Sequence, residues 1–192
     1  MGDVEHGDSL GNKGVITTGA VQWMTAGSGI IHQEMPKGDS QGRMHGFQLW
    51  ANLPARDKMM DPRYRDITAA DIPVVQRPDG TAIKVIAGTV DGSRGPMDDI
   101  VIDPEYLDCA LPPGSAFLHP TRQGHTVFVY VIGGSAEIDG QTVADRDLVL
   151  FNDGAQLLVQ AGDKGAHFLL ISGAPLGEPI ACLLYTSPSP RD

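Results

Sequence analysis

The chain has 192 residues, of which 41% are hydrophobic, and its formal net charge is −10. This acidic balance argues against direct binding to nucleic acid or to an anionic membrane, because both need a basic surface. No apolar run reaches the length of a membrane span and no apolar leader is visible, so we expect a cytoplasmic protein, or a nuclear one if the source is a eukaryote.

The pattern along the chain predicts an all-β fold. Glycine (24) and proline (14) are abundant, aromatic residues make up 6%, and no long stretch has a helical period. In the first half we expect strands at residues 15–16, 21–24, 30–35 and 47–53. The following stretch, to residue 80, carries charges and prolines without a sustained period, although Thr68 and Asp71 could cap one short helical turn.

The second half predicts a further series of short strands. They are expected at residues 83–87, 106–111, 126–132, 136–138, 148–151, 157–159 and 167–171, with a break at 133–134 and a turn at 162–165. His119 and His125 are interpreted as loop residues, and His167 as a hydrogen-bonded core or edge histidine. Cys109 lies in an apolar stretch and is expected to be a reduced, buried and inert thiol.

One short pattern in the first half points to chemistry. His32 and Glu34 are two residues apart, so in a strand both side chains point to the same face. An imidazole and a carboxylate in one space form half of a first-row transition-metal site. Gly27 and Gly29 permit a sharp reversal just before that strand. On spacing alone, two solvated side chains at a strand edge remain an alternative, and His6 is interpreted as a solvated loop histidine.

Three blocks, at residues 22–36, 45–53 and 57–67, together resemble the pirin family, and the resemblance runs from about residue 2 to 180. It implies a cupin-superfamily bicupin, two tandem β-barrels with one Fe(II) in the first. It also implies four metal ligands: two from a His-Pro-His motif and two that correspond to His32 and Glu34.

The implied activity is that of an Fe(II)-dependent dioxygenase acting on flavonols such as quercetin, with dioxygen as co-substrate. Glu34 would take the proton of the substrate hydroxyl. The alternative is a metal- or redox-sensitive regulatory protein that binds a transcription factor or another protein partner without turnover. Trp23 and Trp50 are interpreted as core anchors that could line the pocket beside His32.

The chain departs from the family pattern at both ends. No His-Pro-His motif is present, so we expect an N-terminally truncated fragment that binds iron weakly, with an incomplete first barrel. Residues 181–192 resemble translated adapter sequence and are expected to be a non-native, disordered tail. The predicted domains are a partial N-terminal barrel at 1–55, a connector at 56–80 and a C-terminal barrel at 81–180.

Overall fold

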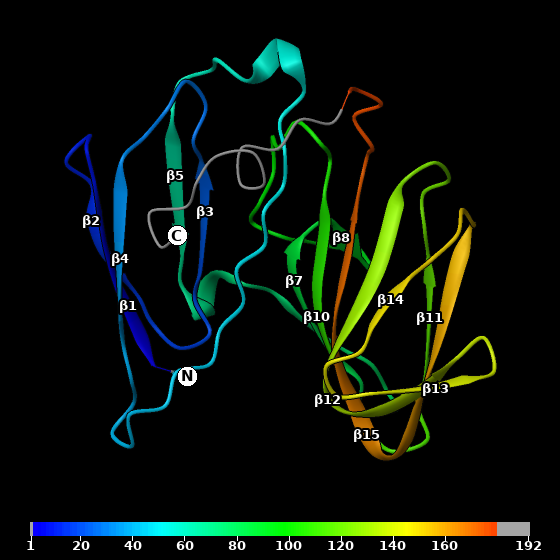
Figure 1. Cartoon of the computed structure of the whole chain (residues 1–192). Helices are drawn as coiled ribbons and strands as arrows, with labels where there is room; N and C mark the ends of the chain where they lie inside the picture. The colour runs from blue at the N-terminus through cyan, green and yellow to red at the C-terminus, as the bar shows by residue number, and fades with distance from the viewer. Residues whose placement is uncertain (1, 180–192) are drawn as a thin grey trace, which may run out of the picture.

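The computed structural model describes residues 2–179, and strands dominate it (Figure 1). Within that range there is no α-helix, only the two 3-10 turns η1 (Ala55–Asp57) and η2 (Ala69–Asp71). The predicted all-β fold is therefore confirmed. No helix in this range is long and apolar enough to cross a membrane. The predicted tail at 181–192 lies outside the described residues.

The first half of the chain forms two small antiparallel sheets. One has the order β2-β1-β4, with β1 (Asp3–Asp8), β2 (Lys13–Ile16) and β4 (His32–Lys37); the other pairs β3 (Val21–Thr25) with β5 (Arg63–Ile67). Among the described residues β4 pairs only with β1, which leaves one of its edges open. The two sheets stand side by side on the left of Figure 1.

The strand predicted at residues 47–53 is wrong. Residues 43–54 have no regular secondary structure, and no described strand lies in register with them to take up their backbone hydrogen bonds. The apolar side chains that suggested a strand are instead exposed: Phe47 (46%), Leu49 (42%) and Trp50 (70%). A strand is stabilised by hydrogen bonds and side-chain contacts with neighbouring strands. No described strand lies beside residues 47–53, so their apolar pattern does not produce a strand.

The second half is a curved eight-stranded sheet with its own large core, on the right of Figure 1. The main path has the order β13-β12-β15-β10-β7-β6, while β11 pairs with β15 and β14 pairs with β12. The strands are β6 (Val74–Gln76), β7 (Ala82–Ala87), β10 (Glu105–Leu111), β11 (Ala116–Pro120), β12 (Thr126–Ile138), β13 (Gln141–Ala144), β14 (Leu148–Leu150) and β15 (Gln156–Gly173). A small hairpin joins β8 (Thr89–Val90) to β9 (Ser93–Arg94).

Two strands are longer than the sequence pattern indicated. β12 runs through the predicted break at 133–134, and β15 runs through the predicted turn at 162–165. The glycines bend the pair instead of ending it, because the register shifts on both sides of Gly133 and Gly134. At Gly134 φ is 71°, and an added Cβ would lie 2.1 Å from the Gly165 carbonyl oxygen. Glycine is therefore required where the two backbones meet.

The predicted connector is divided between the two halves. β5 pairs with β3 of the first half, whereas β6 pairs with β7 of the second. The predicted cap is confirmed at η2, where the Thr68 hydroxyl donates to Asp71 Oδ2 at 2.6 Å. A smaller apolar cluster bridges the halves; its buried members are Ile67, Ile72, Ile86, Ala87 and Met97, with Val21, Trp23, Ile100 and Tyr106 packed against it.

Candidate functional site

His32 and Glu34 lie next to each other on strand β4, as the sequence predicted. Their nearest atoms, His32 Nδ1 and Glu34 Oε1, are 3.8 Å apart, so both side chains occupy the same face. The side chains are 31% and 37% exposed, because β4 is an edge strand in the described residues. The reversal before β4 uses Gly27 at φ 53° and Gly29 at φ 129°, as expected.

The register of β1 against β4 adds two more polar side chains to this face. His6 lies directly opposite Glu34, and Asp8 lies directly opposite His32. Directly opposed residues of an antiparallel pair share one side of the sheet. We call these four side chains, His6, Asp8, His32 and Glu34, the polar face.

The interpretation of His6 as a solvated loop residue is wrong. His6 lies on β1 and is only 7% exposed. Its Nε2 is 2.9 Å from Gln22 Nε2, and the same amide nitrogen donates to Asp66 Oδ1 at 2.9 Å. The His6 ring also stacks on Tyr64, with ring centroids 6.2 Å apart and planes 12° apart. These contacts place the sheet of β3 and β5 against the polar face.

The carboxylate of Asp8 is already committed to a turn. It accepts hydrogen bonds from the Leu10 and Asn12 backbone and from the Asn12 side chain. Desolvation would raise the pKa of Asp8, but these hydrogen bonds outweigh it and the pKa is lowered. Glu34, in contrast, accepts no hydrogen bond from any described residue, so it is the carboxylate of this face that is open to a ligand.

The side chains of the polar face are of types that bind transition metals, but few of them are free to do so. Neutral imidazole and carboxylate are ligands that iron and nickel accept. Across residues 2–179, however, no group of three or more histidine, cysteine, aspartate or glutamate side chains is placed to hold a metal ion. The face therefore offers two donors, His32 and Glu34, and the rest of a coordination shell would have to come from elsewhere.

The two tryptophans lie away from the polar face. Along β3, Gln22 points toward His6, so Trp23 points to the opposite side, where it packs against the apolar cluster that joins the halves. Trp23 and Trp50 together line a cavity of about 310 Å³, with Tyr106 and Phe128 of the second half. The expectation that they lie beside His32 is not met.

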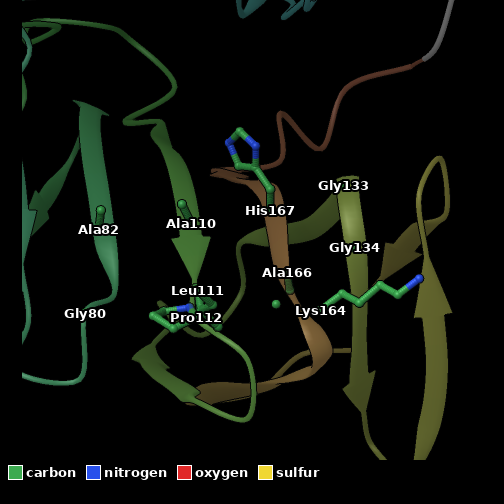
Figure 2. Close-up of a pocket in the computed structure, with 11 residues that line it drawn as sticks. Gly80, Ala82, Ala110, Leu111, Pro112, Gly133, Gly134, Lys164, Ala166 and His167 are labelled. Carbon is green, nitrogen blue, oxygen red and sulfur yellow. The ribbon is translucent and has the colours of Figure 1, made fainter.

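Two histidines of the second half are held by carboxylates of the same barrel. His119 was interpreted as a loop residue, which is wrong: it lies on β11, is 3% exposed and pairs with Glu105 Oε2 at 3.0 Å. His167 is hydrogen-bonded, as expected, with its Nε2 2.5 Å from Asp108 Oδ1. It is one of the residues that line a pocket of about 480 Å³, and most of the others are glycines and alanines (Figure 2).

Family models match both halves of the chain. Residues 1–51 match the model of the Pirin family, and residues 106–183 match the model of the Pirin C-terminal cupin domain. A pirin-like protein of Caulobacter vibrioides is 42% identical over 93% of the chain and 64% of its own length. The chain belongs to the pirin family. Its two halves are the cupin barrels of a bicupin, and among the described residues the first barrel is open.

Two solved structures that resemble this chain have names that specify a reaction or a metal. The quercetin 2,3-dioxygenase of Acinetobacter baumannii superposes with a TM-score of 0.83 at 33% identity, over 95% of this chain and 65% of that one. A bacterial pirin of Escherichia coli, solved in complex with nickel(II), superposes with a TM-score of 0.70 at 28% identity, over 91% of this chain and 69% of that one. This chain thus spans about two thirds of the length of these two proteins.

Proposed function

We propose that this pirin-family chain carries part of the site of an Fe(II)-dependent dioxygenase that acts on flavonols such as quercetin, and that His32 and Glu34 are two of its metal ligands. One observation carries the proposal: the two donors are neighbours on one face, and the Glu34 carboxylate accepts no hydrogen bond from the described residues. The quercetin dioxygenase and nickel complex among its relatives support the substrate class and a divalent metal.

The residues of the polar face would have different roles in binding and catalysis. A bound divalent ion would act as a Lewis acid and orient an ionised substrate oxygen. Glu34 has a free oxygen with which to accept the proton of the substrate hydroxyl. Behind it, His6 is fixed by Gln22 and by stacking on Tyr64, so the wall of the site is held in place before a ligand arrives.

The proposal is tested by titrating the chain with Fe(II) under anaerobic conditions and with Ni(II), using calorimetry. Binding is expected to be weak, because two donors are present, and His32→Ala or Glu34→Gln should weaken it further by about tenfold or more. The exposed Glu137 on β12 supplies the matched control, and Glu137→Gln should leave the affinity unchanged. Equal affinity in all four proteins would place the ion elsewhere and sink the assignment.

A further inference from the structure

Strand β4 has an open edge in the described part of the chain. All six of its residues are exposed, and among residues 2–179 it pairs only with β1. The Ser9 amide donates to the Ile31 carbonyl at 2.8 Å, so the backbone groups of Ile31 point toward β1. Since these groups alternate in direction along an antiparallel strand, those of His32 and Glu34 point to the open edge. Another strand can therefore pair with β4 at this edge.

The sequence of β4 is complementary to a second copy of itself. In an antiparallel pair centred on Gln33, His32 of one copy lies directly opposite Glu34 of the other, and the two-fold symmetry repeats this contact with the copies exchanged. Directly opposed side chains share one face, and their Cβ atoms are about 4.5–5.5 Å apart. Two imidazoles and two carboxylates then stand together on the polar face, whereas the described residues of one copy offer only His32 and Glu34.

The other face of the same pair covers apolar side chains. Ile31 of one copy lies opposite Met35 of the other, and in the single chain these residues are 80% and 45% exposed. The pairing ends at Pro36, whose nitrogen has no hydrogen to donate across the edge. A register centred on Glu34 would instead set two carboxylates directly against each other. The register centred on Gln33 is therefore the favourable one.

The paired stretch, residues 31–35, is short. Its backbone hydrogen bonds and apolar contacts alone stabilise a dimer only weakly. One copy, in turn, supplies too few donors to hold a metal ion tightly. Pairing and metal binding are therefore linked, because an ion that binds the pair and not the single chain draws the chains together.

We propose that two copies of the chain pair along β4 and bind one divalent transition-metal ion between them, through His32 and Glu34 of each copy. Two imidazole nitrogens and two carboxylates form a donor set that iron, nickel and zinc accept. The inference rests on the proposed function, because it uses the same two ligands, and it identifies a second copy of the chain as the source of the other donors.

Sedimentation of the full chain with and without Ni(II) tests the proposal. The chain should sediment as a monomer in the presence of a chelator and as a dimer with Ni(II). Calorimetry should give one ion for two chains, and the apparent affinity should rise with chain concentration because the ion binds to the pair. His32→Ala should remove the dimer.

Charge changes on the opposite face test the pairing and leave the metal donors in place. In Ile31→Lys with Met35→Lys, two like charges oppose each other across the pair, so the dissociation constant of the dimer in Ni(II) should rise by about tenfold or more. In Ile31→Glu with Met35→Lys, opposite charges meet, and the dimer should return. Both variants lose the same apolar contact, so the difference between them reports the opposed charges alone. In the single chain position 35 is exposed and lies opposite Glu5, so a lysine is tolerated there.

The possible results separate this inference from the proposed function. One ion per chain in a monomer, lost in His32→Ala, would overturn the inference and leave the proposed function intact. No bound ion at any chain concentration would remove both. A dimer that persists in the chelator, or equal dissociation constants for the two charge variants, would also overturn the pairing along β4.

Discussion

At the scale of single residues, a glycine makes room for the buried histidine of the polar face. Gly14 on β2 lies directly opposite His6 on β1, and an added Cβ would lie 2.4 Å from His6 Nε2. Nothing in the sequence around His6 predicted this, because one histidine among polar residues has no apolar period. His6 is buried because β1 pairs with β2 and β4. This pairing joins distant parts of the chain and cannot be read from the residues next to His6. His32 and Glu34, in contrast, could be predicted, because their spacing within one strand decides which face they share.

Gly14→Ala is expected to displace the His6 ring and to break its contact with Gln22. Overpacking of this kind lowers the free energy of unfolding by about 1–3 kcal/mol. Gly46→Ala is the matched control, because an added Cβ there meets nothing within 4 Å. Urea unfolding of both variants measures the difference, and equal stability would show that the ring moves aside without cost.

A second residue-scale prediction concerns Asp108, which joins β10 to its neighbours. Burial raises the pKa of Asp108, but hydrogen bonds from His167 and Lys84 outweigh it, and the pKa is lowered overall. A lowered pKa in the folded state stabilises the fold above the unfolded pKa of about 3.9, and this contribution is lost as the pH falls through the folded value. Asp108→Asn should therefore cost about 1–2 kcal/mol at pH 7 and progressively less below pH of about 4.

The measurement for Asp108 is urea unfolding of wild type and variant from pH 3 to pH 8. Asp163→Asn, at an exposed position on β15, is the control and should track the wild type throughout. A difference between Asp108→Asn and wild type that stays constant down to pH 3 would mean that the ionised carboxylate is not what stabilises the fold.

At the scale of elements, several short strands were predictable, but their extent was not, and the strands β1, β5 and β11 were missed. Strands β3, β7 and β10 follow local apolar patterns, and the structure confirms them near the expected residues. β12 and β15 each join two predicted strands, because a glycine inside a long paired strand gives a bulge when its neighbour bends with it. The opposite error occurred at residues 47–53, where an apolar pattern has no partner strand among the described residues.

At the scale of elements, we predict that the turn before β4 requires glycine at position 27. At Gly27, φ is 53° and an added Cβ would lie 2.1 Å from the Met60 carbonyl oxygen, which also accepts from the Ser28 amide at 2.8 Å. Gly27→Ala combines backbone strain with a clash against backbone, so we expect a loss of at least about 2 kcal/mol in the free energy of unfolding. Gly29→Ala is strained as well, at φ 129°, but meets nothing within 4 Å. A Gly29→Ala loss as large as that of Gly27→Ala, in thermal melts, would contradict the role of the clash.

At the scale of the whole molecule, the two halves differ in how much core they contain. The second barrel surrounds a large apolar cluster, with Phe117, Leu107, Phe168 and Leu170 fully buried. The first half presents exposed apolar side chains, Ile31 and Trp50 among them, and an open edge at β4. The bridging cluster and the hydrogen bonds from Arg63 and Arg65 to the loop at 98–99 connect the halves.

This asymmetry predicts unequal hydrogen exchange. Amides of residues 43–53 should be deuterated at the earliest time points, because they have no partner strand, while those of β10, β12 and β15 should be protected longest. Mass spectrometry of peptides from the exchanged protein measures this directly. Similar protection in both regions would show that residues 43–53 are paired in solution.

Strand β3 has a consequence for spectroscopy. It places Gln22 against the polar face and the next residue, Trp23, against the apolar cluster next to the second barrel. A contact of the site and an indole ring are therefore carried by adjacent residues of one strand. The chain has two tryptophans, and the other, Trp50, is 70% exposed. Trp23 lies on the opposite side of β3, so its emission is expected to report a ligand at the polar face only when binding moves the strand itself.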